Sequence, residues 1–123
     1  MAYDSNNIFA KILRGEIPCD KVYESDHSLA FKDINPQAPV HTLVIPKGAY
    51  VSFDDFSEKA SDAEVVDYIR AIGVVAREAG VAEDGYRILA NIGQNGFQEV
   101  PHLHVHIFGG QHLGRMIKPF DKS

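Results

Sequence analysis

One segment near the end of the chain, Pro101–Phe108, constrains the fold more than any other. Histidine alternates in it with leucine, valine and isoleucine. Because successive side chains of a β-strand point to opposite faces, this alternation predicts a strand over 102–108 with its histidines on one face and its aliphatic residues on a buried face. The histidines are His102, His104 and His106, and the expected core residues are Leu103, Val105 and Ile107. Three histidines on one face indicate a chemical site.

The rest of the chain predicts four more strands and two helices. Runs of β-branched and apolar residues between turn residues are typical of strands. These runs are Lys21–Glu24, Ser28–Lys32, His41–Ile45 and Tyr86–Asn91. Apolar residues at helical spacing predict a short helix over Ile8–Arg14 and a long helix over Ser61–Glu78. Since strands and helices do not alternate regularly, we expect the α+β class, with a five-stranded antiparallel meander sheet.

Length and charge narrow the possible functions. At 123 residues the chain has the size of one domain, and we expect residues 1–123 to form it. Its apolar runs are far shorter than the stretch of about 20 residues that spans a bilayer, and no signal-peptide pattern precedes Ile8, so we expect a cytoplasmic protein that binds no membrane. A net charge of −5 without a Lys/Arg cluster argues against binding polymeric nucleic acid. Any nucleotide partner should be small.

A zinc site is one interpretation of the three histidines, because imidazole is a common zinc ligand. However, His102 and His106 lie four residues apart. That spacing is about 13 Å along a strand, whereas two nitrogens on one zinc ion lie within about 4 Å. All three therefore do not easily share an ion, and we expect no metal and no other cofactor.

Nucleophilic and acid–base catalysis is the other interpretation. An imidazole with the ordinary pKa of about 6.5 is mostly the free base at neutral pH, so it is nucleophilic without a metal. A neighbouring imidazole with a raised pKa would then donate a proton. Histidines spaced along a strand can also line an extended phosphate.

The segment 102–108 resembles the His-x-His-x-His-x-x signature of the histidine-triad (HIT) family, in which x is apolar, and Gly109-Gly110 follows it as in the Hint branch. Residues 31–46, Phe-Lys-Asp-Ile-Asn-Pro-Gln-Ala-Pro-Val-His-Thr-Leu-Val-Ile-Pro, resemble the second signature of that branch. Residues 8–12 and 15–18 resemble its opening, so the resemblance runs in order from about residue 8 to 116. It implies a HIT-like fold. It also implies a homodimer, in which the long helix and a strand join the two sheets across a two-fold axis.

The resemblance also implies an activity. The protein would be a metal-independent hydrolase of nucleoside 5′-phosphoramidates or related conjugates of AMP or GMP. His104 would take the nucleotide as a covalent nucleotidyl-histidine, which water then hydrolyses. His106 would contact the phosphate and assist the leaving group, while His41 and His102 support the array.

Binding residues follow from the same resemblance. Donors near Gln98, Glu99 and Val100 would hold the phosphate, with Asn91 beside them. Asp33 would accept hydrogen bonds from both ribose hydroxyls, because an ionised carboxylate has only acceptors. An apolar slot would hold the base, and its residues would be Phe9, Ile12, Phe31, Ile34 and Leu43.

Three positions depart from the family pattern. Many Hint proteins have glycine and serine where this chain has Phe97 and Glu99, and an aromatic residue where it has Pro101. The serine donates a hydrogen bond near the leaving group, which an ionised carboxylate cannot do, so we expect only the backbone of Glu99 to serve. The segment 111–116 lies where the family's tail shapes leaving-group specificity.

Other functions fit the same residues. A regulatory module that binds purine nucleotides needs the base slot and Asp33 but no nucleophile. A dinucleoside polyphosphate hydrolase, the sister branch of the family, would use the same chemistry on a different substrate. A zinc-dependent hydrolase or zinc carrier would contain stoichiometric metal. Covalent labelling of His104, comparison of substrates and metal analysis separate these functions.

Overall fold

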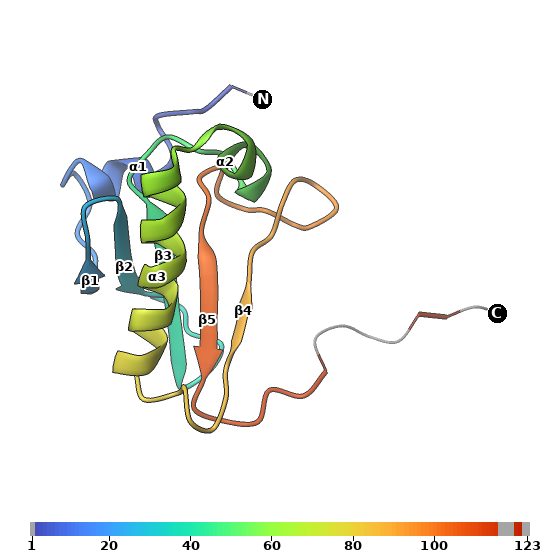
Figure 1. Cartoon of the computed structure of the whole chain (residues 1–123). Coiled ribbons are helices and arrows are strands. Elements are labelled where there is room, and N and C mark those ends of the chain that lie inside the picture. The colour runs from blue at the N-terminus through green and yellow to red at the C-terminus, as the bar shows by residue number, and fades with distance from the viewer. Residues whose placement is uncertain (1, 116–119, 122–123) are drawn as a thin grey trace.

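The computed structural model describes residues 2–115 and 120–121, and it has the α+β architecture expected (Figure 1). Its helices are α1 (Ile8–Leu13), α2 (Phe53–Lys59) and α3 (Asp62–Glu78). Its strands are β1 (Lys21–Glu24), β2 (Ser28–Lys32), β3 (Val40–Pro46), β4 (Arg87–Leu89) and β5 (Val105–Gly109). In the part of the chain that the structure describes, no helix is both long and apolar enough to cross a membrane.

The five strands form one antiparallel sheet in the order β1-β2-β3-β5-β4. The predicted meander is therefore confirmed for the first three strands and wrong for the last two, which exchange places. β5 lies inside the sheet because its alternate residues Val105 and Ile107 are buried on the core face. β4 lies at the edge, where Ile88 is half exposed. Alternation within a strand does not identify its neighbours, so this order was not predictable from pattern alone.

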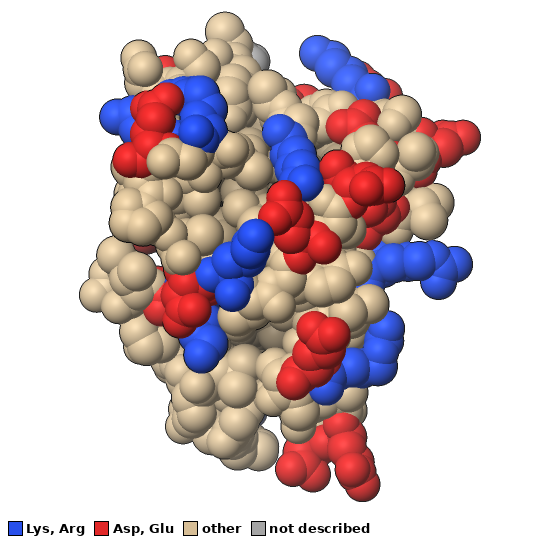
Figure 2. Space-filling model, turned by 90° about the vertical axis from the view of Figure 1, so that its left-hand side faces the viewer, with Lys and Arg blue, Asp and Glu red and all other residues tan. Residues whose placement is uncertain are grey.

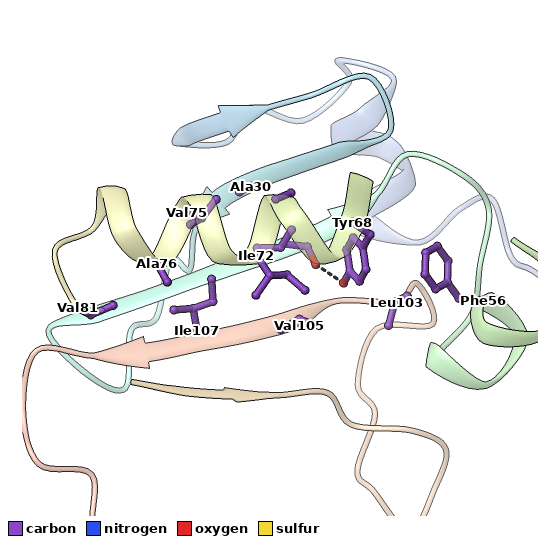
Figure 3. Packing of buried hydrophobic residues seen from close by; sticks show 12 residues of the cluster. Ala30, Phe56, Tyr68, Ile72, Val75, Ala76, Val81, Leu103, Val105 and Ile107 are labelled. Carbon is purple, nitrogen blue, oxygen red and sulfur yellow. Dashed lines mark hydrogen bonds between the residues drawn. The ribbon is translucent and has the colours of Figure 1, made fainter. Parts of the chain in front are cut away.

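The long helix α3 covers one face of the sheet (Figures 1 and 3). Ser61 caps its start in a reciprocal capping box with Glu64, which satisfies free backbone N–H groups of the first turn. Its buried stripe of apolar residues packs on the inward residues of β2, β3 and β5, and each such buried aliphatic side chain contributes about 1.5–3 kcal/mol. The fully buried Tyr68 also donates its hydroxyl hydrogen to the carbonyl of Val44, at 2.7 Å.

The opposite face of the sheet carries a second, smaller apolar cluster. It contains Phe9 from α1, Leu29 and Phe31 from β2, and Leu43 and Ile45 from β3. These strand residues alternate with Ala30 and Val44, which face α3. The sheet thus separates a purely structural face from a face that is only partly covered by α1.

The short helix α2 was not predicted from the sequence. Ser52 caps it, and the Asp55 carboxylate accepts a hydrogen bond from the Ser52 backbone N–H at 2.7 Å. The two interactions make a second capping box. Phe56 fills a core position between the rings of Tyr50 and Tyr68. The Ser-x-x-Asp spacing was the available signal, but the helix is too short to show an apolar period.

The histidine segment is only partly a strand. β5 begins at Val105, so the expected strand over 102–108 is wrong for its first three residues. There the chain turns: the His102 N–H donates to the carbonyl of Val100 and the Leu103 N–H to that of Tyr50, both at 2.9 Å. The burial of Leu103, Val105 and Ile107 is confirmed. The predicted strand over 86–91 is likewise shorter, and Arg14 ends α1 as its C-cap.

Candidate active site

A cleft of about 770 Å³ opens on the face of the sheet opposite α3. It lies between α1, the loop that follows β2, the loop over 91–100 and the histidine segment. Most of the residues expected at the site line it: Phe9, Ile12, Phe31, Asp33, Ile34, Leu43, Asn91, Glu99, Val100, His104 and His106. Residues more than ninety positions apart along the chain therefore meet around one cavity.

Three of the expected residues do not line this cleft. His102 is fully buried beneath the surface, and His41 lies behind His106, where it borders a separate cavity of about 460 Å³. The side chain of Gln98 is used inside its own loop. These three residues can act on a ligand in the cleft only through other groups or through their backbone.

The backbone sets the protonation pattern of the His104 ring. Its Nδ1 lies 2.7 Å from the carbonyl oxygen of His102. A carbonyl only accepts, so a neutral His104 carries its hydrogen on Nδ1 and keeps a lone pair on Nε2. The ring of Phe9 packs edge-on against the imidazole, with centroids 5.0 Å apart, and limits its rotation. His104 therefore offers an unprotonated nitrogen to the cleft, as a nucleophile must.

A second hydrogen-bond chain sets the pattern of His106. The backbone N–H of Gln37 donates to His41 Nδ1 at 3.1 Å, so His41 carries its hydrogen on Nε2. That nitrogen lies 2.9 Å from His106 Nδ1 and 3.4 Å from a carboxylate oxygen of Asp33. His106 Nδ1 is then the acceptor, and the hydrogen of a neutral His106 is on Nε2. His106 therefore offers an N–H donor to a ligand, next to the free nitrogen of His104.

Burial lowers the pKa of all four histidines. The pKa values of His102 and His106 fall to about 4, chiefly because burial disfavours the charged ring. Burial also lowers the pKa of His104, against the weaker effects of its hydrogen bond to the His102 carbonyl and of the Asp33 charge. It lowers the pKa of His41 against the Asp33 charge alone. The expectation that one neighbour has a raised pKa is wrong, because no part of the array is exposed enough to keep a charged imidazole solvated. Burial therefore favours the uncharged form of each of the four rings.

One set of potential metal ligands is present among the described residues. Ligand atoms of Asp33, His41 and His106 all lie within 4.8 Å of one another. The two histidines already share a hydrogen bond, so an ion between them would have to displace that hydrogen. The argument from strand spacing considered only the triad and missed this set, because it joins residues from two different signatures.

The loop over 93–99 is held by the side chain of Gln98. Its Oε1 accepts from the Gly93 N–H at 3.1 Å, and its Nε2 donates to the carbonyls of Val51 and Val100 at 2.6 and 3.0 Å. Next to it, Phe97 has a φ of 59° and a side chain that is 73% exposed at the rim of the cleft. Glu99 is also exposed at the rim, and its charge weakly opposes the lowering of the His104 pKa by burial.

Several residues of the site were not identified from the sequence. Phe108 lines the cleft and stacks on His106 with the ring planes 2° apart, and its position two residues after His106 was the signal for it. Tyr3 contacts His102, and nothing in the sequence near it indicated this. Of the segment 111–116, residue 116 lies outside the described residues.

Comparisons with known proteins agree with this architecture. Residues 14–113 match the model of the HIT domain. A HIT-like protein of 13.2 kDa from Azospirillum brasilense is 66% identical over 115 residues, covering 94% of each chain. The purine nucleoside phosphoramidase of Escherichia coli K12 is 44% identical over 110 residues, or 89% of this chain and 92% of that one. The structure of a HIT family hydrolase from Clostridium thermocellum superposes with a TM-score of 0.84 at 40% identity, covering 94% of this chain and 99% of that one. The chain belongs to the HIT domain family.

Proposed function

We propose that the protein hydrolyses nucleoside 5′-phosphoramidates or related conjugates of AMP or GMP, through a covalent nucleotidyl intermediate on His104. The observation that carries the proposal is the pair of ring nitrogens at the cleft. His104 presents a lone pair that the His102 carbonyl keeps unprotonated, and His106 presents a hydrogen that His41 keeps in place. The similarity to an enzyme named purine nucleoside phosphoramidase supports the choice of substrate.

The cleft has surfaces for the three parts of a nucleotide. Apolar side chains from α1, β2 and β3 offer a slot for the base. Asp33 lines the cleft with a partly exposed carboxylate, which suits both ribose hydroxyls. Figure 2 shows acidic and basic side chains intermingled on one face of the molecule, without a continuous basic patch there. That face therefore lacks the run of cations that a polymeric nucleic acid needs.

The first step forms the covalent intermediate. The lone pair on His104 Nε2 attacks phosphorus, and the P–N bond breaks with its electron pair going to nitrogen. The His102 carbonyl stabilises the positive charge that develops on the His104 ring through the Nδ1–H hydrogen bond. His106 donates its Nε2–H to a phosphoryl oxygen. The leaving nitrogen takes its proton from water in the open cleft and departs as the amine.

The second step releases the nucleotide. Water attacks phosphorus from the side that the amine has left, and the electron pair of the bond between phosphorus and nitrogen returns to His104 Nε2. Water supplies one hydroxyl to the nucleoside monophosphate, and its proton replaces the one that the amine took. Splitting one displacement into two uses the same nucleophile and the same N–H donor twice.

A fluorogenic adenosine 5′-phosphoramidate tests the proposal. The assay runs with excess chelator, with His104→Ala and with the remote His27→Ala as a matched control. We expect turnover by the wild type and by His27→Ala, and none by His104→Ala, which keeps the base slot and still binds AMP. Trapping the adenylylated His104 by rapid alkaline quench would identify the intermediate, because the P–N bond of such an adduct survives base and hydrolyses in acid. Equal turnover by His104→Ala overturns the mechanism.

Three results would each favour another function. Turnover that the chelator abolishes, together with stoichiometric metal, would favour a zinc hydrolase built on the Asp33, His41 and His106 set. Tight AMP binding without turnover or adduct would favour a regulatory module. Faster cleavage of a dinucleoside polyphosphate than of the phosphoramidate would favour the sister activity.

We also propose a homodimer in which β4 pairs with its counterpart in a second copy. β4 is an edge strand of three residues whose outer backbone groups have no neighbour in the described part of the chain. Ile88 on this strand is 50% exposed, and Val66 and Ile69 leave apolar surface on the outer side of α3. Continuing the sheet would cover an edge that is otherwise open to aggregation. Sedimentation should give twice the chain mass of 13.6 kDa, and the mass of one chain refutes the dimer.

A further inference from the structure

His102 is a buried residue whose hydrogen-bonding atoms connect three parts of the chain. Its side chain is fully buried and does not reach the cleft. Its Nε2 lies 2.9 Å from the carbonyl of Pro46 at the end of β3, and its Nδ1 lies 2.6 Å from the hydroxyl of Tyr3. Its own carbonyl accepts the Nδ1–H of His104. The backbone of His102 therefore orients the nucleophile, while its ring is held at both ends.

The direction of each hydrogen bond follows from the groups involved. The carbonyl of Pro46 only accepts, so the hydrogen of a neutral His102 is on Nε2. Nδ1 then has a lone pair, and the Tyr3 hydroxyl is the donor to it. Among the described residues, Tyr3 is the only one with a polar atom within hydrogen-bond distance of that lone pair. The chain of donors thus runs from Tyr3 through the His102 ring to β3.

The segment that carries Tyr3 is anchored firmly. The Asp4 carboxylate accepts from the Asn6 N–H at 2.9 Å, and the Asp4 carbonyl accepts from the Asn7 side chain at 2.7 Å. Asn7 in turn caps α1. Figure 1 shows this segment at the end of the sheet where β5 begins. The ring of Tyr3 packs edge-on against His102 with centroids 5.5 Å apart, so its position does not depend on the hydroxyl alone.

We propose that Tyr3 is a positioning residue for the nucleophile: its hydroxyl holds the buried His102 ring in the Nε2–H form and thereby fixes the carbonyl that orients His104. The inference rests on the proposed function for its catalytic consequence. Without the hydroxyl, Nδ1 becomes a buried acceptor without a protein partner, which is unfavourable. The His102 ring then shifts, or a water molecule enters beside it. The backbone carbonyl of His102 moves as a result.

Tyr3→Phe tests this inference, because it keeps the packed ring and removes only the hydroxyl. Tyr23→Phe is the matched control, since the Tyr23 hydroxyl has no hydrogen bond with the described part of the chain and is remote from the cleft. Three quantities are measured: the ¹⁵N chemical shifts of the His102 ring in the free protein, the single-turnover rate of adenylyl-His104 formation, and the dissociation constant for AMP.

In Tyr3→Phe we expect the His102 Nδ1 signal to move and the rate of adduct formation to fall roughly tenfold, since small displacements of a reacting group cost up to about 100-fold in rate. The dissociation constant for AMP should change less than about twofold, because Tyr3 does not line the cleft. Tyr23→Phe should match the wild type in all three. An unchanged His102 signal overturns the inference whatever the rate does, and so does an unchanged rate. If even the wild type forms no adduct, the proposed function fails, and the His102 signal still decides whether Tyr3 holds the ring.

Discussion

The hydrogen bonds of the Gln98 side chain allow a quantitative prediction. Gln98→Glu keeps the shape of the side chain and the oxygen that accepts from Gly93. It replaces the Nε2 donor with a carboxylate oxygen that faces the carbonyls of Val51 and Val100, formerly at 2.6 and 3.0 Å. The substitution removes two hydrogen bonds and adds electrostatic repulsion between oxygens.

The expected loss of stability follows from these two bonds. Each neutral hydrogen bond contributes about 0.5–1.5 kcal/mol net, so the free energy of unfolding should fall by about 1–3 kcal/mol at neutral pH, more if the repulsion is not relieved. For a chain of this size, each kcal/mol lowers Tm by roughly 3–5 °C. Protonating the new carboxyl restores one donor, so the loss should be largest at neutral pH and shrink as the pH falls.

Urea denaturation at about pH 7 and about pH 4 measures both effects, because the linkage of protonation to stability appears as a pH-dependent difference between variants. Gln94→Glu is the matched control: it makes the same charge change in the same loop at an exposed position. Its free energy of unfolding should stay within about 0.5 kcal/mol of the wild type. Equal losses in the two variants, or a loss in Gln98→Glu that does not shrink at acid pH, refute the reasoning.

Three further predictions concern the cleft. Burial lowers the pKa of His104 and brings that of His106 to about 4. Because protonation removes the nucleophile, kcat/KM should be lost only as the pH falls below the ordinary histidine range; a midpoint at or above about 6.5 in the pH–rate profile contradicts the burial effect. Asp33→Ala should weaken binding of AMP by about 1–3 kcal/mol but that of 2′-deoxy-AMP by less, in calorimetric titrations; equal losses would show that another residue contacts the sugar. Phe97→Gly should leave stability to urea unchanged or raise it by up to about 1 kcal/mol, because it relieves a left-handed backbone at φ 59° and removes a side chain that is 73% exposed; a large loss would mean that Phe97 packs on the loop.

Local patterns predicted much of the fold. The alternation around Val105 identified the core residues of β5, and the period of α3 identified the helix that covers them. The same alternation failed at His102, because residues 102–104 form a turn in which all three residues are buried, and alternation of histidine with apolar residues does not distinguish such a turn from a strand. The order of β4 and β5 also escaped prediction, since pairing is decided by packing between distant segments.

The candidate site was likewise predictable only in part. The family resemblance predicted that His104, His106 and Asp33 lie at one site. In the structure all three line the same cleft. The hydrogen bond between His41 and His106 joins residues 65 positions apart, and that between Tyr3 and His102 joins residues 99 apart. Neither leaves a periodic signal. The prediction of a raised pKa failed for a similar reason, because the burial of an imidazole depends on the whole fold.

The histidine array described above is governed at each end by groups that never titrate. The amide of Gln37 and the carbonyls of Pro46 and His102 decide which nitrogen of each ring carries hydrogen. The backbone therefore fixes which ring nitrogens carry hydrogen, and a change of pH above the histidine pKa values does not alter that arrangement. In the proposed reaction, each ring would return to the same donor and acceptor arrangement after hydrolysis. A site of this kind would need no proton rearrangement before it binds the next substrate.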